Sequence, residues 1–129
     1  MNYIKTFEKY DNSDIDDILS KISNFLDSNL RNLWISNNEI SIYIRRSKRS
    51  FKGNMYDFFD FASIEVTEPG SGLFTKILEK FEELYPDKNI FIESVLTERF
   101  ANYIRNVLNF EEEMPNYSNN FYKIKSNKI

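Results

Sequence analysis

Residues 61–81 read FASIEVTEPGSGLFTKILEKF, and this stretch decides which fold the sequence predicts. It begins with an aromatic and β-branched run of the kind found in strands. It ends with a run whose apolar residues recur at helical spacing. Between the two runs lie Gly70 and Gly72, although the whole chain holds only three glycines. The pattern therefore predicts a strand, a glycine turn and a helix in succession.

The glycine turn has two interpretations. A turn at the start of a helix directs several backbone N–H groups toward one point, and the helix dipole adds to their attraction for an anion. Glycine suits such a site because it has no Cβ to block the turn geometry or the approach of a phosphate. On the pattern alone, a purely structural turn is the commoner explanation by about two to one. The sequence of the rest of the chain is needed to choose between the structural turn and the anion site.

Composition limits both the fold and the chemistry. With 129 residues, 41% of them hydrophobic, we expect residues 1–129 to form one domain with a real core. Cysteine and histidine are absent, which excludes thiol nucleophiles, Ser-His-Asp triads and the usual zinc ligand sets. We find no apolar membrane span and no secretory signal, and therefore expect a cytoplasmic protein. An enzyme made from this chain would have to use carboxylates, hydroxyls, Lys, Arg and backbone dipoles.

The hydrophobic pattern predicts the order β-α-β-β-β-α-β-α-β, an α/β fold with a mixed sheet. The strand that follows the second helix should run parallel to the one before it, because a helix of suitable length connects them. The predicted strands are residues 2–10, 33–36, 39–45, 56–66, 89–95 and 119–125, and the predicted helices are residues 11–30, 73–85 and 97–110.

Apolar residues at helical spacing predict the buried face of each helix. The expected inward residues are Ile15, Ile18, Leu19, Ile22, Phe25 and Leu26 in the first helix, Phe74, Ile77, Leu78, Phe81 and Tyr85 in the second, and Phe100, Tyr103, Ile104, Val107 and Leu108 in the third.

Residues 44–52, IRRSKRSFK, carry five basic residues and no acid. We interpret them as a solvated hairpin loop that turns at Gly53-Asn54, since charge runs usually face solvent. The other interpretation is a contact surface for a protein partner. The remaining chain holds 12 basic against 20 acidic residues, which argues against nucleic acid as a partner. The basic residues of the segment are Arg45, Arg46, Lys48, Arg49 and Lys52.

From about residue 33 to residue 124 the sequence resembles the GNAT superfamily, the acetyl-CoA-dependent N-acetyltransferases. The resemblance rests on FASIEV, PGSGLFTKIL, IFIESV, TERFANYIRNVL followed by Asn109-Phe110, and FYKI. The family often has Gly-Phe where this chain has Asn109-Phe110, and Asn is the commonest substitute for Gly in left-handed geometry. The string ASIEV…GxGxFTxxL…ESVLxxRFAxxI is also similar to small GNAT-like proteins of bacteriophages, which would place the protein in the cytoplasm of a host cell. The resemblance implies a mostly antiparallel twisted sheet with helices on both faces.

The resemblance implies an acetyl-CoA cofactor and transfer of its acyl group to an amine of a protein, nucleotide or small molecule. The pantetheine arm would lie along Ile64-Glu65-Val66, in the splay between this strand and residues 90–94. The amine would attack the thioester directly, so that no His, Cys or metal is needed. Coenzyme A pyrophosphate would accept hydrogen bonds from the backbone of Gly70, Ser71, Gly72, Leu73, Phe74 and Thr75.

The resemblance makes Glu65 and Glu93 candidates for the general base, although each also reads as a solvated or ion-paired strand residue. Many family members protonate the leaving thiolate with a Tyr at the position of Arg105. Tyr103 lies nearby and is the candidate acid. The alternative interpretation is that Tyr103 is a packing residue in the core or at its rim. Ser94 and Thr97 would donate hydrogen bonds near the thioester or cap the following helix.

The family's turn motif is Gln or Arg, two residues, Gly, one residue, then Gly or Ala, which falls on residues 69–74 here, and two residues depart from it. Pro69 stands in place of Gln or Arg, and Phe74 stands in place of a small residue. We expect Phe74 to turn inward, since it shares the helical spacing of Ile77 and Leu78. The departures keep a second hypothesis open: a degenerate GNAT-fold phage protein that binds a host or phage protein, with the basic residues of 44–52 as its contact surface.

Overall fold

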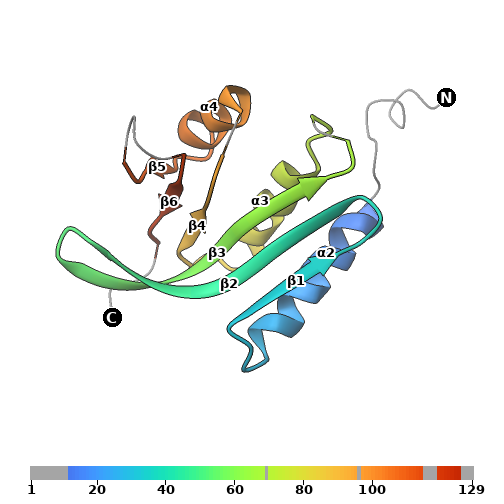
Figure 1. Ribbon diagram of the computed structural model, residues 1–129, viewed down its shortest axis with the longest axis horizontal. Helices are drawn as coiled ribbons and strands as arrows, with labels where there is room; N and C mark the ends of the chain where they lie inside the picture. Colours follow the sequence, from blue (N-terminus) through green and yellow to red (C-terminus); the bar gives the residue numbers. More distant parts are fainter. Residues whose placement is uncertain (1–11, 69, 96, 115–118, 126–129) are drawn as a thin grey trace. The chain divides into compact units, whose positions relative to one another are not determined.

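The computed structural model describes residues 12–68, 70–95, 97–114 and 119–125 (Figure 1). Over these residues the chain is an α/β protein with a mixed sheet, as predicted. The strand expected at residues 2–10 lies outside the described residues. None of the described helices has the length and hydropathy that a membrane crossing requires.

In the described part of the chain the sheet has six strands in the order β1-β2-β3-β4-β6-β5. The strands are β1 Asn32–Ser36, β2 Ile40–Phe51, β3 Asn54–Val66, β4 Ile90–Ile92, β5 Glu111–Glu112 and β6 Phe121–Lys123. The helices are α2 Asn12–Leu26, α3 Leu73–Leu84 and α4 Glu98–Asn106. The two-residue strand β5 was not predicted, because two consecutive glutamates carry no strand signal.

Strands β3 and β4 are parallel, which confirms the prediction made from the helix that connects them. Phe59 lies opposite Ile90, and Phe61 lies opposite Ile92. The backbone N–H of Glu93 donates to the carbonyl of Phe61 at 3.1 Å, just beyond the last residue of β4. Strands β4 and β6 are antiparallel, as are β5 and β6.

The basic segment is a strand and not a loop, so the loop prediction was wrong. Strand β2 continues through the segment to Phe51, and the chain turns only at Lys52 and Gly53, whose φ angles are 52° and 81°. The result is a long β2–β3 hairpin (Figure 1). Its charged residues are accommodated in a strand because acidic side chains of β3 and Glu93 pair with Arg45, Lys48 and Arg49.

The structure divides into two compact units, and the chain alternates between them. The first holds the described residues up to Tyr43 together with Ile64–Pro86. In this unit α2 contacts α3 and β1. Asn37 shapes the β1–β2 turn, since its Oδ1 accepts from the backbone N–H groups of Glu39 and Ile40 at 2.8 and 3.1 Å. The buried helix residues are Ile15, Ile18, Leu19, Ile22, Phe25, Leu73, Phe74, Ile77, Leu78 and Phe81, while Leu26 and Tyr85 are half-buried.

The second unit holds Ile44–Ser63 and the described residues from Asp87 onward. Phe58, Phe91 and Tyr122 form a buried aromatic cluster, and Phe51 stacks on Tyr122 with ring centroids 4.1 Å apart. In α4, Ile104 is buried as expected.

Val107 was wrongly predicted to face inward. Helix α4 ends at Asn106, so the helical spacing no longer applies at Val107, which is 57% exposed. Asn109 then adopts the predicted left-handed conformation, with φ 64°. Phe110 follows it and is buried, and its backbone N–H donates to the carbonyl of Ile104 at 2.8 Å. The Asn109-Phe110 pair therefore closes the helix as its sequence indicated.

Candidate functional site

The glycine turn in the first unit has the geometry that the sequence predicted. Gly70 and Gly72 have φ angles of 87° and 83°, and Gly72 is the N-terminal cap of α3. A Cβ added to Gly70 would meet no atom within 4 Å. The left-handed backbone therefore favours glycine there, and the space beside it is open.

Some amides of this turn already have partners within the turn. The backbone N–H of Ser71 donates to the carbonyl of Glu68 at 3.2 Å. The N–H of Leu73 donates to Ser71 Oγ at 3.4 Å, which is long for a hydrogen bond. The side chains of Leu73 and Phe74 are buried, which confirms the inward orientation expected for Phe74. Thr75 is half-buried in the first turn of the helix, and Pro69 lies outside the described residues.

The end of β3 carries the other residues assigned to the cofactor. Ile64 and Val66 are half-buried, and Glu65 between them is exposed. The next residue, Thr67, is bonded to the β1–β2 turn through its N–H to Glu39 O at 2.9 Å and its Oγ1 to Asn38 O at 3.0 Å. Glu65 thus has the exposure of a solvated strand residue.

A cluster of charged side chains in the second unit was not predicted. Its centre is Asp60, the one buried charged residue among those that the structure describes. Asp60 Oδ2 accepts from Arg45 Nε at 2.8 Å and from Arg49 Nη2 at 2.9 Å, and Oδ1 accepts from Ser47 Oγ at 2.8 Å. We call Arg45, Ser47, Arg49, Asp60 and Glu93 the Asp60 cluster.

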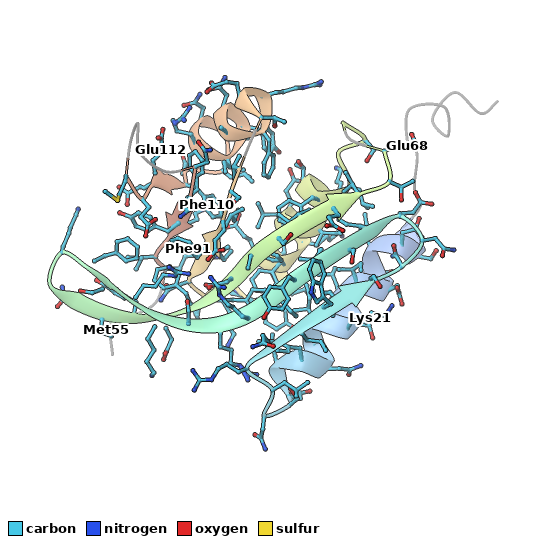
Figure 2. All side chains as sticks on the ribbon, viewed as in Figure 1. Lys21, Met55, Glu68, Phe91, Phe110 and Glu112 are labelled. Atoms are coloured by element: carbon cyan, nitrogen blue, oxygen red, sulfur yellow. The ribbon has the colours of Figure 1, made fainter. Side chains whose placement is uncertain are left out.

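Glu93 completes the Asp60 cluster at its more exposed side. Its Oε1 accepts hydrogen bonds from Arg45 Nη2 and, at 3.2 Å, from Arg49 Nη2. The guanidinium of Arg49 also lies over the ring of Phe91, 3.5 Å from its centroid; Phe91 is labelled in Figure 2. The sequence left Glu93, if it has no catalytic role, as either a solvated or an ion-paired strand residue, and the structure shows it ion-paired.

Strand periodicity explains how the cluster assembles. Arg45, Ser47 and Arg49 alternate along β2 and so project from one face of it. Asp60 is the Cα partner of Phe91 in the parallel pair, and Glu93 follows Phe91 by two residues. The sequence signal was therefore present as an R-x-S-x-R alternation and as one acid within the apolar run FFDF, but nothing in the sequence showed that they meet.

The candidate acid region lies on α4. Arg105, at the position where the resemblance would put a Tyr, pairs with Glu112, with Nε to Oε1 at 2.7 Å. Tyr103 is half-buried on the same helix. Thr97 Oγ1 accepts from the N–H of Phe100 at 3.3 Å and caps α4, as one of its two readings predicted. Ser94 is exposed, with φ 58°.

Two further expectations concern metals and partners. In the described ranges, no group of His, Cys, Asp or Glu side chains is arranged to hold a metal ion. The basic segment is largely offset by acids, because Arg45 and Arg49 belong to the Asp60 cluster and Lys48 pairs with Asp57 at 3.1 Å. Its five positive charges therefore do not form one free basic surface.

Within the second unit, burial raises the pKa of Tyr122, and the charge of Glu111 and a hydrogen bond to it raise this pKa further. Glu111 lies opposite Tyr122 in the β5–β6 pair.

In comparisons with models of protein families, with curated proteins and with solved structures, none matched this chain.

Proposed function

We propose that the protein is an acyl-CoA-dependent N-acyltransferase of GNAT type, which transfers an acetyl group to an amine. The observation that carries the proposal is the glycine turn between β3 and α3, with left-handed Gly70 and Gly72. The parallel pairing of β3 and β4 and the left-handed Asn109 before the buried Phe110 support it as well. The finer GNAT arrangement, with helices on both faces of the sheet, is part of this proposal.

In this proposal the pyrophosphate of coenzyme A binds at the start of α3. The open space beside Gly70 leaves room for it, and the helix dipole favours an anion at that end. The long contact between Leu73 N–H and Ser71 Oγ is weak, so a phosphate oxygen can replace it at little cost. Ile64 and Val66 would offer backbone groups to the pantetheine arm.

The bound cofactor would supply the thioester as the activated bond. The chain's own residues would hold the amine and accept its proton, which is work for a carboxylate. Glu65 and Glu93 are the candidates, and Tyr103 is the candidate proton donor to the leaving thiolate. Glu93 is the better-fixed carboxylate, because two guanidinium groups hold one of its oxygens.

Titration calorimetry with acetyl-CoA tests the cofactor site. Gly72→Asp should abolish the saturable heat, because a carboxylate would occupy the place of a phosphate. Gly72→Asn is the matched control, since Asn has nearly the same shape, tolerates the left-handed backbone and carries no charge. The wild-type protein and Gly72→Asn should bind. Absence of saturable heat with the wild-type protein at about millimolar acetyl-CoA would overturn the proposal.

One observation favours the second candidate, a degenerate GNAT-fold protein that binds a host or phage protein. The ion pair of Arg105 with Glu112 fills the position of the family's usual acid. Such a protein would show no turnover, whether or not it binds acetyl-CoA. Release of free thiol from acetyl-CoA in the presence of a panel of amines, measured with a thiol reagent, would count against this candidate.

A further inference from the structure

The Asp60 cluster has a feature that stability alone does not explain. Asp60 is fully buried in a run of phenylalanines, and removing a carboxylate from water is costly. Buried ion pairs can often be replaced by apolar residues without loss of stability. What Asp60 does achieve is to fix two guanidinium groups on one strand, through Arg45 Nε and Arg49 Nη2.

Arg49 is held on three sides. Nε donates to Ser47 Oγ at 3.1 Å, Nη2 donates to Asp60 and Glu93, and the flat face of the group rests on Phe91. A guanidinium fixed in this way presents its remaining N–H groups in a defined direction. Arg49 Nη1 makes no hydrogen bond within the part of the chain that the structure describes.

Glu93 is fixed in the same way but through only one of its oxygens. Both arginines bind Oε1, whereas Oε2 has no partner among the described residues. The side chains of Glu93 and Arg49 are 23% and 21% exposed, so solvent reaches both. The cluster therefore presents one hydrogen-bond acceptor and one donor of opposite charge, on side chains that are bonded to each other.

The charges of the cluster decide which ligand fits. The buried charge of Asp60 offsets one guanidinium, and the exposed side then shows Glu93 together with the second. A diamine bound to Glu93 would place its second ammonium group beside a guanidinium, which repels it. A simple anion bound to the guanidinium would be repelled by the Glu93 carboxylate. A molecule with both signs of charge satisfies both groups.

We propose that the Asp60 cluster binds a small zwitterion: an amine that carries an anionic group, carboxylate or phosphate, a few bonds from its nitrogen. The ammonium binds Glu93 Oε2, and the anionic group binds Arg49 Nη1. The cluster lies at the carboxyl end of β4, where its pairing with β3 ends, and ligands of α/β sheets bind beyond such strand ends.

This inference deepens the proposed function. It rests on that function only in one respect: if the protein is an acyltransferase, the zwitterion is the acyl acceptor. Glu93 takes one proton from the ammonium, the freed amine forms the N–C bond, and the C–S bond breaks. The second proton of the nitrogen passes through water or Tyr103 to the thiolate that leaves, and the product is the N-acyl amide, which keeps the anionic group of the zwitterion.

Nitrogen-15 NMR of the arginine side chains tests the inference without acetyl-CoA. The probes are β-alanine and phosphoethanolamine, and the controls are putrescine, which lacks an anionic group, and propionate, which lacks an amine. We expect the Nε–Hε signal of Arg49 to shift saturably with at least one zwitterion, at an affinity about tenfold or more above that for either control. Equal responses to all four compounds, or no response at about 50 mM, would overturn the inference.

Two variants and a matched control complete the test. Glu93→Gln and Arg49→Lys should each weaken zwitterion binding about tenfold or more, the second because Lys keeps the charge but loses the planar donor group. Asp57→Asn removes an exposed acid of the same hairpin and should leave binding unchanged. Melting temperatures show whether each variant is folded. Binding that survives in a folded Glu93→Gln variant would contradict the assigned site.

Repeating the titration with acetyl-CoA separates the two proposals. If the zwitterion binds but acetyl-CoA does not, the ligand site stands and the transferase proposal fails. If acetyl-CoA binds but no zwitterion binds, whether or not acetyl-CoA is present, the transferase proposal stands and the proposed zwitterion site fails.

Discussion

The glycine turn and the Asp60 cluster are two candidate sites of different physical origin. The turn is local: Gly70 and Gly72 adopt left-handed conformations that other residues disfavour, so their identity alone indicated the geometry. The cluster is non-local, because its side chains come from β2, β3 and the end of β4. Backbone requirements can therefore be recognised in a sequence, whereas charge pairing across strands can be recognised only once the fold is known.

The largest expected effect is a loss in the free energy of unfolding when the Asp60 cluster is disrupted. Asp60→Ala should cost about 3–5 kcal/mol, because it removes the buried acid that both part-buried guanidinium groups bind and leaves them to share Glu93. Urea denaturation measures the loss. Asp57→Ala is the control on the same strand: its pair with Lys48 is about two-thirds exposed and should contribute less than about 1 kcal/mol. Equal losses for the two variants would remove the distinction between the buried cluster and an ordinary surface pair.

A smaller effect is expected at the glycine turn. Gly70→Ala should cost about 1–2 kcal/mol, the penalty for a left-handed residue with a Cβ. No steric term is added, because the Cβ would meet open space. Gly70→Asn should cost less than Gly70→Ala in the same denaturation experiment, since Asn tolerates this conformation better. If Gly70→Ala were as costly as Asp60→Ala, the turn would be held by contacts and not by its backbone alone.

The elements that the sequence predicted correctly are those with a local signal. Helix α3 and its buried Phe74 followed from 3.6-residue spacing, and Asn109 followed from its tolerance of left-handed geometry. The parallel β3–β4 pair followed from the length of the helix between them. In each case the decisive residues lie within one element or its connection.

The errors and omissions share the opposite property. The basic segment looked like a solvated loop because its acidic partners lie 9 to 48 positions further along the chain. Asp60 was hidden within an apolar run, where no periodicity marks a single buried acid. The sequence also gave no means to choose between Glu65 and Glu93. The structure separates them by environment, with Glu65 exposed and Glu93 bonded to two arginines.

The smallest effect concerns Tyr122, which joins the aromatic cluster of the second unit to β5. Burial and Glu111 raise its pKa above the ordinary value of 10.0, so the neutral phenol is the form that the folded protein favours. This contribution to stability is fully present below pH 10.0 and is lost as pH rises through the raised pKa. Thermal unfolding followed from pH 8 to pH 12 should therefore show a steeper alkaline loss for the wild-type protein than for Tyr122→Phe. Parallel curves would mean that the phenol ionises as readily in the folded chain as in the unfolded one, and that the environment of β6 is wetter than its packing against Phe51 indicates.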